Sequence, residues 1–317
     1  MEQSNTEIID VSVIIVNYNS FHLLKKCLGS LIRFTTDVNY EIIVVDNNST
    51  EGDVAEVTTI YDKVVLIKNK VNLGFAAANN IGIEHSKGKY FLFINNDIIF
   101  HENSVKKIFD FAENAGKDLF IGCELLNMDG SHQISIVDFD NILNSFGENF
   151  FLYKLFRTSS TLNRYHLNFK TIREPIEIDI IKGAFMFCSS LAIKKLSGFD
   201  TRFFFYGEEA DLCYQFRKMG GKVYYFPHTS VFHIGGASAD SNEWFKFRNQ
   251  HVSKIKRYQK HLKNPRFAVI TFFYYVGLLL RIPAYLIIGA STLNKILICQ
   301  SYYYLKILFI YPCNEFN

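Results

Sequence analysis

The chain has 317 residues, of which 49% are apolar, so it can bury a full hydrophobic core and carry an appendage beside it. Its formal net charge is only +3, which gives no global sign of a protein that binds nucleic acid. The six cysteines include no Cys-x-x-Cys pair and have no histidine at zinc spacing, so we interpret them as core or incidental thiols in a reducing cytosol.

Apolar runs alternate with helical patterns along the first hundred residues. This alternation predicts βαβ units around a mostly parallel sheet, and hence an α/β fold class. In chain order, we expect a strand at 11–19, a helix at 21–32 with leucines on one face, strands at 40–49 and 64–69, a turn and helix at 72–88 that stops at Gly88, and a strand at 90–97.

Three of these strands end in asparagine or aspartate. The ends are Asn17 with Asn19, the run 46–48, and the triplet 95–97. One such triplet alone is explained equally well by a surface turn or by a ligand site. Parallel sheets bind their ligands at the carboxyl ends of the strands, where all three polar ends should meet. The sequence therefore predicts a ligand site at this edge.

Two phosphate-binding motifs are absent from the sequence, and their absence limits the kinds of ligand that the site could bind. No Gly-x-Gly-x-x-Gly follows the first strand, and no Gly-x-x-x-x-Gly-Lys-Ser/Thr occurs anywhere, so neither a dinucleotide site nor a phosphate-loop NTPase is favoured. A diphosphate bound without a glycine cradle needs another positive partner. A divalent cation held by Asp97 would supply one, because hard cations take carboxylate and phosphate oxygens together.

Five segments occur in an order that points to a known family: "VSVIIVNYNS", "YEIIVVDNNST", "NLGFAAANNIGI", "YFLFINNDI" and "GFDTRFFFYGEEADLCYQFRKMGGKVYYFPHTSVFHIGG". With them, residues 11–238 resemble the family-2 glycosyltransferases with the GT-A fold, in the rhamnosyltransferase-like branch that builds bacterial surface polysaccharides. The resemblance implies an inverting, metal-dependent transfer of rhamnose or another hexose from a nucleoside-diphosphate sugar. The acceptor would be a glycan or a lipid-linked glycan.

The resemblance also assigns residues to the nucleotide. Asp46 would contact the pyrimidine base, and the alternative is that Asp46 only forms an Asx turn. The other residues assigned to the nucleotide side are Asn17, Tyr18, Asn72, Gly74, Asn95 and Asn96.

The metal motif of the family, Asp-x-Asp, reads Asn95-Asn96-Asp97 here, which leaves one fewer anionic ligand. The resemblance assigns the metal, Mn²⁺ or Mg²⁺, to Asp97 and His233, and an imidazole ligand suits Mn²⁺ better than Mg²⁺. His228 and His251 are rivals of His233. The glycines that follow His233 favour it, because they allow a diphosphate to approach closely.

The segment "FFFYGEEADLC" supplies the expected catalytic base. The resemblance assigns the base to Glu209, at the start of a helix expected over 209–219, with a glutamate in place of the usual aspartate. Glu208 remains a rival because the longer side chain shifts the carboxylate. Asp211 is expected to cap or orient. The alternative for all three acids is that they only stabilise the helix dipole.

The C-terminal part combines basic and apolar stretches. Residues 246–266 carry eight Lys or Arg and no acid, and the apolar run 267–290 follows at once. We expect a GT-A domain at 1–240, with an acceptor-side segment at 131–180, and membrane-associating helices at 241–317 that lie in or re-enter the interface.

Two alternatives for these helices stay open. One is a spanning helix, against which Arg281 and Pro283 argue. The other is a soluble helical pair packed on the core or at a homo-oligomer interface. The N-terminal "MEQSNTEIID" lacks the pattern of a signal peptide, so we expect the catalytic part at the cytoplasmic face of the membrane, attached peripherally or monotopically.

Two other functions are also considered. A sugar-nucleotide nucleotidyltransferase would want a glycine-rich, basic signature after the first strand, which "NYNSFHLL" lacks. A non-catalytic protein that binds sugar nucleotides or acts as a scaffold is suggested by Asn95 and Glu209, which depart from the family pattern. It predicts binding without turnover.

Overall fold

The computed structural model describes residues 8–116, 118–166, 172–235 and 243–310. The chain forms two compact units, one of residues 1–137, 169–204 and 208–241, and one of residues 138–168, 205–207 and 242–317. The division predicted at residue 240 stays a prediction. The contacts group residues 138–168, which the sequence analysis placed in the first domain, with the C-terminal segment.

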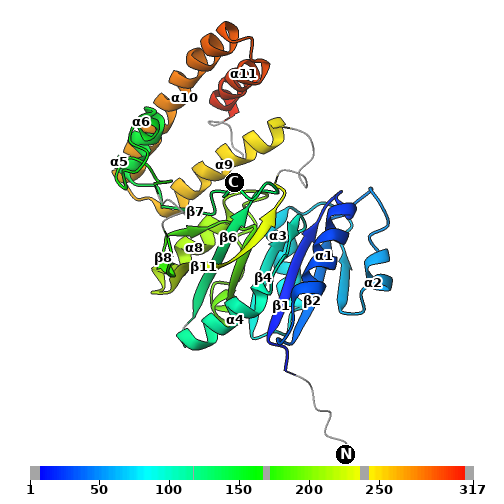
Figure 1. The fold of residues 1–317 in the computed structure, drawn as a ribbon. Helices are drawn as coiled ribbons and strands as arrows, with labels where there is room; N and C mark the ends of the chain where they lie inside the picture. The colour runs from blue at the N-terminus through cyan, green and yellow to red at the C-terminus, as the bar shows by residue number, and fades with distance from the viewer. Residues whose placement is uncertain (1–7, 117, 167–171, 236–242, 311–317) are drawn as a thin grey trace, which may run out of the picture. The chain divides into compact units, whose positions relative to one another are not determined.

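A nine-stranded mixed sheet forms the centre of the first unit, in the order β3-β2-β1-β4-β10-β6-β11-β5 with β8 beside β11 (Figure 1). Neighbours β3, β2, β1 and β4 are parallel, as are β6 and β11, while β10 runs antiparallel between β4 and β6. The predicted α/β class with a GT-A-type, mostly parallel central sheet is confirmed. The strands are β1 (Val11–Asn17), β2 (Tyr40–Asp46), β3 (Val64–Lys68), β4 (Tyr90–Asn95), β5 (Ile98–Ile99), β6 (Leu119–Leu126), β8 (Ile176–Glu177), β10 (Phe185–Ser189) and β11 (Lys222–His233), with β7 (Ile136–Val137) and β9 (Ile180–Ile181) forming a separate pair.

Helices cover both faces of the sheet because its strands are apolar on both sides. Ile42 and Val44 of β2 pack in the same cluster as residues of the first and fourth helices, while Ile43 and Val45 pack with Ala78 of the third. The helices of this unit are α1 (Phe21–Phe34), α2 (Glu56–Ile60), α3 (Phe75–Glu84), α4 (Ser104–Ala115), α7 (Ser190–Lys195) and α8 (Glu208–Lys218).

The helix patterns of the first unit are confirmed with one correction. The buried face of α1 is the predicted one: Leu23, Leu24, Cys27, Leu28 and Leu31. Helix α3 ends at Glu84, so the predicted stop at Gly88 was wrong. A Cβ at Gly88 would lie 2.5 Å from the backbone nitrogen of Ser12, so glycine is needed there for close approach to β1.

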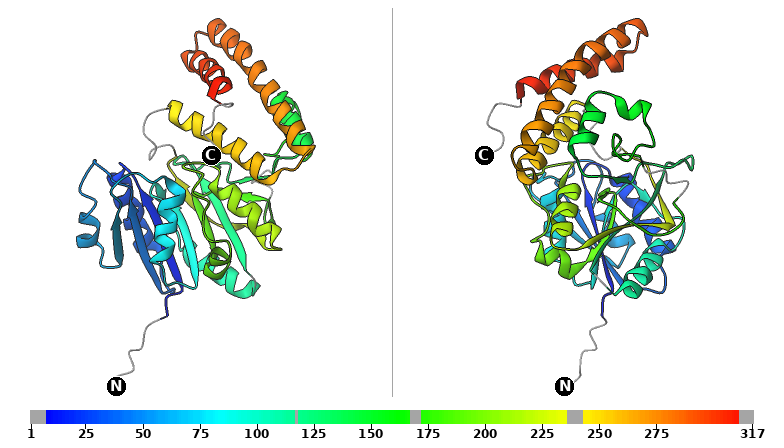
Figure 2. Two further views of the ribbon diagram at one scale, coloured as in Figure 1. Left: turned by 180° about the vertical axis from the view of Figure 1, so that it is seen from behind. Right: turned by 90° about the vertical axis from the view of Figure 1, so that its left-hand side faces the viewer.

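The second unit is helical, and its last two helices lie side by side as a hairpin (Figure 2). Among the described residues, one helix, Arg266–Ser291, is long and apolar enough to cross a membrane, and it continues through Pro283. Its mean hydropathy reaches 1.7, but core helices of soluble proteins pass the same test. The helices are α5 (Ile142–Asn149), α6 (Leu152–Leu155), α9 (Glu243–His261), α10 (Arg266–Ser291) and α11 (Lys295–Ile310).

A buried charge cluster connects the two main segments of this unit. Asp140 forms an ion pair with Arg164, accepts a hydrogen bond from the Tyr258 hydroxyl at 3.0 Å, and lies 3.5 Å from Arg257 and 3.9 Å from Lys254. The side chains of Lys254 and Arg257 are only 15% and 14% exposed. Two of the eight basic residues expected to face a membrane therefore pair inside the unit instead.

Candidate functional site

The polar ends of β1, β2 and β4 converge as predicted. The parallel registers set Asn17 opposite Asp46 and Val16 opposite Asn95. The Asn17 amide donates to Asp46 Oδ1 at 2.9 Å, and the Asn96 amide donates to Asn17 Oδ1 at 2.8 Å. Asn17, Asp46 and Asn96 are all buried, so their hydrogen bonds fasten the three strand ends together.

Asp46 also makes the turn that the alternative interpretation expected. Its Oδ2 accepts a hydrogen bond from the Ser49 backbone N–H at 3.0 Å, and its Oδ1 accepts one from the Ser49 hydroxyl at 2.6 Å. Carboxylate oxygens have two acceptor positions each, so these bonds do not prevent a further donor from binding. Tyr18, half-buried, follows the end of β1, and its carbonyl accepts from the Ser20 hydroxyl. The predicted nucleotide roles of Asp46 and Tyr18 stay predictions.

Asn72 and Gly74 build the turn that leads into α3. The Asn72 side-chain oxygen accepts a hydrogen bond from the Gly74 N–H at 2.9 Å. Gly74 has φ of +83°, and a Cβ there would lie 2.5 Å from the Phe204 carbonyl oxygen. The Asn47 amide donates to the Gly74 carbonyl at 3.1 Å, which ties this turn to the end of β2. Both residues thus have a structural task at the site edge.

Asp97 and His233 lie side by side, because β5 and β11 pair His233 with Ile98. His233 Nε2 is 3.4 Å from Asp97 Oδ1, and Asp97 Oδ2 accepts a hydrogen bond from the Gly235 N–H at 2.9 Å. Asp97 Oδ1 is buried and has no hydrogen-bond partner in the described part of the chain. A buried, unpaired carboxylate oxygen calls for a positive partner.

The two rival histidines are placed elsewhere. His228 is about half exposed and 3.6 Å from Glu174. His251 belongs to the second unit, where its Nδ1 is 2.7 Å from the Tyr274 hydroxyl. Burial, with help from the nearby positive charges of Lys254 and Arg281, lowers the pKa of His251 to about 3. Only His233 of the three has the position beside Asp97 that the metal assignment requires.

The geometry of the Asp97–His233 pair fits a divalent cation. Two ligand atoms about 2.1 Å from one cation lie about 3.0–3.4 Å apart when the angle between them is roughly 90–110°. The observed separation of 3.4 Å falls at the upper end of this range. The described residues contain no group of three or more His, Cys, Asp or Glu that could hold a metal. A cation here would therefore complete its coordination with substrate oxygens and water, as Mg²⁺ does at phosphates.

The acidic start of α8 lies beside the same strand end. Gly183 packs against Glu209, because a Cβ at Gly183 would lie 3.4 Å from the Cβ of Glu209. The next residue, Ala184, accepts a hydrogen bond from the Asn95 N–H at 3.1 Å. Glu209 is half-buried and interacts electrostatically with Lys182. The contacts thus bring Glu209 next to the Asn95–Asp97 motif.

The other two acids of α8 are buried. Burial and the neighbouring Glu209 carboxylate raise the pKa of Glu208 well above its ordinary value of 4.5. Asp211 is fully buried and accepts a hydrogen bond from the Gln215 amide at 2.7 Å. Burial thus disfavours the ionised form of Glu208, and the orienting role of Asp211 stays a prediction.

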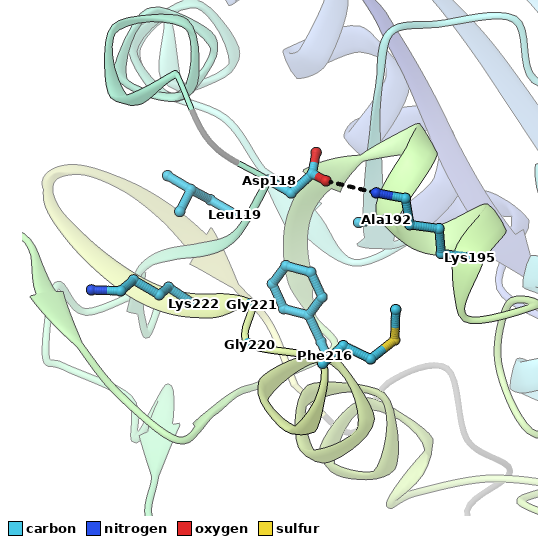
Figure 3. Close-up of a pocket in the computed structure, with 9 residues that line it drawn as sticks. Asp118, Leu119, Ala192, Lys195, Phe216, Gly220, Gly221 and Lys222 are labelled. Carbon is cyan, nitrogen blue, oxygen red and sulfur yellow. Dashed lines mark hydrogen bonds and ion pairs between the residues drawn. The ribbon is translucent and has the colours of Figure 1, made fainter.

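A separate pocket of about 430 Å³ lies at the opposite edge of the sheet (Figure 3). It is lined by Leu119 and Lys222, the first residues of β6 and β11, and by Phe216 of α8. Strand β6 runs in the same direction as β4, because β10 is antiparallel to both. The amino end of β6 is thus remote from the carboxyl end of β4, and this pocket is not the candidate site.

Two residues near the site were not predicted. Gln133 accepts a hydrogen bond from His233 Nδ1 at 2.8 Å, and Lys182 lies beside Glu209. Gln133 belongs to the segment 131–180, whose sequence lacks a regular pattern, and Lys182 lies just beyond its end. No signal in the sequence marks them, since their importance comes only from the side chains they meet.

Comparison with known proteins agrees with this geometry. The family model described as Glycosyl transferase family 2 matches residues 12–174, which include all the polar strand ends described above.

The chain belongs to glycosyl transferase family 2.

Relatives of this glycosyltransferase differ in length. Rhamnosyltransferase WbbL of Escherichia coli K12 is 26% identical over 78% of this chain and 92% of its own. An uncharacterized glycosyltransferase of Rickettsia felis is 36% identical over 105 residues, which are 32% of this chain and 17% of that protein. The chain spans only 17 to 38% of the length of the first curated relatives it matches.

A solved structure supports the fold. The mannosyltransferase PcManGT of Pyrobaculum calidifontis, in complex with GDP-Man and Mn²⁺, superposes with a TM-score of 0.57 over 96% of this chain and 86% of its own. At 15% identity this similarity demonstrates the shared GT-A fold and nothing finer.

Proposed function

We propose that this family-2 glycosyltransferase transfers rhamnose or another hexose from a nucleoside-diphosphate sugar to a glycan or lipid-linked glycan, with inversion, in cell-surface polysaccharide synthesis. The observation that carries the proposal is the Asp97–His233 pair, which presents an unpaired carboxylate oxygen 3.4 Å from an imidazole nitrogen. The related proteins support the donor class, since one is named a rhamnosyltransferase and another was solved with GDP-Man and Mn²⁺.

The residues around the pair would divide the chemistry among them. Glu209 accepts the proton of the acceptor hydroxyl while the hydroxyl oxygen bonds to the anomeric carbon. The bond from that carbon to the diphosphate oxygen breaks, and the nucleoside diphosphate leaves with the electron pair. Burial and the neighbouring Glu209 carboxylate raise the pKa of Glu208 and disfavour the ionised form that a base needs, so Glu209 is proposed as the base.

Asp97 and His233 would hold a divalent cation, Mn²⁺ or Mg²⁺, which when bound neutralises charge on the departing diphosphate. Asn95 lies beside His233, with its amide nitrogen 3.2 Å from Nε2. Asp46, fixed by Asn17 and Ser49, would accept a hydrogen bond from the N–H of a pyrimidine base.

Donor turnover tests the proposal. The purified protein is given UDP-, dTDP- and GDP-sugars with lipid-extract acceptors and either cation, and nucleoside diphosphate release is measured. Glu209→Gln should lower kcat by roughly 10²–10⁴-fold with donor affinity retained, because it removes only the base. Asp97→Ala should lose both turnover and cation dependence. Glu84→Gln, at an exposed position, is the matched control.

The alternatives give different results in the same assay. A non-catalytic protein binds a nucleotide sugar and releases no nucleoside diphosphate from any donor. A nucleotidyltransferase releases pyrophosphate from a nucleoside triphosphate and a sugar phosphate. Full activity in Glu209→Gln, with loss in Glu208→Gln, would reassign the base.

We also propose that the α10–α11 hairpin attaches the protein to the cytoplasmic face of a membrane without spanning it. Lys263 and Arg266 are exposed where α10 begins, which suits an anionic surface. Arg281, midway along α10, donates to the Glu148 carbonyl at 2.8 Å and the Gly277 carbonyl at 2.9 Å. These bonds tie the middle of the helix to the polar end of α5, which favours interfacial attachment.

A further inference from the structure

Gln133 stands behind His233 on the side away from Asp97. We infer that Gln133 is a positioning residue that selects the tautomer of His233 and so keeps the Asp97–His233 pair open to a divalent cation. The inference rests on the function proposed above, in which this pair holds the cation, and it adds a residue that the sequence analysis did not foresee.

The orientation of the Gln133 carboxamide is fixed by its hydrogen bonds. Its Nε2 donates to the His233 backbone carbonyl and to Asn127 Oδ1, the latter at 2.7 Å. The Asn127 amide is itself engaged with the Ser131 hydroxyl at 2.8 Å, and the Gln133 backbone N–H donates to the Leu125 carbonyl. Because both partners of Nε2 are acceptors, the amide cannot be turned round without placing oxygen against oxygen.

This orientation determines where the proton of His233 lies. Gln133 Oε1, which can only accept, is 2.8 Å from Nδ1, so Nδ1 carries the hydrogen. A neutral imidazole has one N–H, and Nε2 is then a bare lone pair. The Asn95 amide nitrogen, 3.2 Å from Nε2, gives independent agreement because it can only donate.

The other tautomer would close the site. With its hydrogen on Nε2, His233 would donate to Asp97 Oδ1, 3.4 Å away, and the two side chains would satisfy each other. With its hydrogen on Nδ1, two lone pairs face each other, and a cation can reach both once it displaces the Asn95 amide from Nε2. Gln133 therefore favours the His233 tautomer that leaves Asp97 Oδ1 without a hydrogen bond in the empty site and that allows both side chains to bind a cation.

Cation binding by the ligand-free protein tests the inference without any assay of turnover. Mn²⁺ is titrated into the full chain, and free Mn²⁺ is followed by its electron paramagnetic resonance signal. Gln133→Leu should weaken binding by about 10–100-fold, as loss of an outer hydrogen-bond partner usually does. Gln133→Glu keeps an acceptor at Nδ1 but places its second oxygen against the His233 carbonyl and Asn127 Oδ1, so it should keep the tautomer and restore only part of the affinity. Gln250→Leu, at an exposed position, should bind like the wild type.

Nitrogen-15 NMR of the histidine rings provides a second readout. The metal-free wild type should show His233 with its hydrogen on Nδ1, and Gln133→Leu should show the hydrogen on Nε2. Equal Mn²⁺ affinity in wild type and Gln133→Leu, or an unchanged tautomer, would overturn the inference and leave the proposed function standing. Failure of the wild type itself to bind Mn²⁺ would overturn the cation site and the inference together. Thermal unfolding of each variant confirms that the fold is retained.

Discussion

At the scale of single residues, two adjacent glutamates at the start of α8 have opposite surroundings. Glu208 is buried, and its Oε2 has no hydrogen-bond partner among the described residues, while Glu209 is half-buried beside Lys182. Burial and the charge of Glu209 raise the pKa of Glu208. Two carboxyl groups whose surroundings are separated in this way are suited to different roles. This separation supports the choice of Glu209 as the base.

The raised pKa of Glu208 predicts a pH-dependent gain in stability on mutation. In the wild type, the carboxyl stabilises the fold fully below its unfolded pKa and loses that contribution as pH rises through the folded value. Glu208→Gln cannot ionise, so it should be more stable than wild type at pH 8 and about equally stable at pH 4. Urea unfolding at both pH values measures this difference in the free energy of unfolding. Each 1.4 kcal/mol gained by Glu208→Gln at pH 8 corresponds to about one pKa unit of the Glu208 shift.

A matched substitution distinguishes this effect from a general one. Glu84→Gln, at an exposed position on α3, should change stability by little at either pH. If Glu208→Gln lowered stability at pH 8 more than at pH 4, Glu208 would instead be an ionised structural partner.

Some of the site could be predicted from the sequence and some could not. Asn17, Asp46 and Asp97 were predicted to converge because strand ends are recognisable and parallel strands share an edge. Gln133 could not be found, since it acts through the imidazole of a residue 100 positions away. The resemblance already favoured Glu209 over Glu208, but the burial of Glu208 could not be predicted, because only packing decides which of two neighbours is buried.

At the scale of elements, the helices divide into two kinds. Helix α1 follows its apolar spacing closely, and its buried face was predicted residue by residue. Helix α10 is apolar on nearly all sides, so its spacing does not say which side is covered. In the structure, Tyr274, Gly277 and Leu278 are buried, whereas Leu286 and Ile287 further along are exposed. The far end of the hairpin is therefore one of the parts that lack cover within its own unit, together with Phe272 and Leu279 nearer the start of α10.

This exposed end predicts how the hairpin attaches to lipid. Ile287→Asp and Leu293→Asp, at positions 66% and 86% exposed, should abolish flotation with vesicles that contain anionic phospholipid, because each places a charge where an apolar side chain would insert. Lys263→Gln with Arg266→Gln should weaken flotation mainly at low salt. Phe156→Asp, at an exposed position outside the hairpin, is the control.

Other outcomes identify a different occupant. Unchanged flotation of both hairpin variants would contradict the attachment proposed here. Loss of a dimer in sedimentation, with no vesicle binding by the wild type, would show that a second copy of the chain covers the hairpin.

At the scale of the whole molecule, the second unit is assembled from distant parts of the chain. Residues 138–168 and 242–317 meet around Asp140. No pattern in the sequence predicts such a pairing, because an ion pair between residues more than 100 positions apart produces no periodic pattern of residues. The division at residue 240 was drawn from composition, which changes sharply there and hardly at all near residue 138.

We expect removal of the Asp140 charge to cause a large loss of stability in the second unit. Burial alone would raise the pKa of Asp140, but Arg164, Lys254 and Arg257 hold it below its usual range. Its contribution is therefore present above the unfolded pKa and is lost as pH falls through the folded value. Asp140→Asn should lower the free energy of unfolding at pH 7 by about 3–5 kcal/mol, because Arg164 and Arg257 lose their nearest carboxylate, although Lys254 keeps Glu148 at 2.8 Å.

The single tryptophan, Trp244 on α9, allows this unit to be followed by itself through its fluorescence in urea. Asp62→Asn, at an exposed position, serves as the control and should leave the urea concentration of the unfolding transition unchanged. A transition of Asp140→Asn at the wild-type urea concentration would show that the cluster adds nothing to stability.

The discontinuity of the second unit also sets an order in time during synthesis. Arg257 follows Arg164 by 93 positions (257 − 164 = 93), which corresponds to about 5–19 s of synthesis at the usual pace of roughly 5–20 residues per second. In that interval Arg164 can already pair with Asp140 and approach Glu148, which lies 4.0 Å from it in the finished unit. The part made first thus pairs Arg164 with one of its two carboxylates, and Lys254 and Arg257 supply the remaining positive charge later.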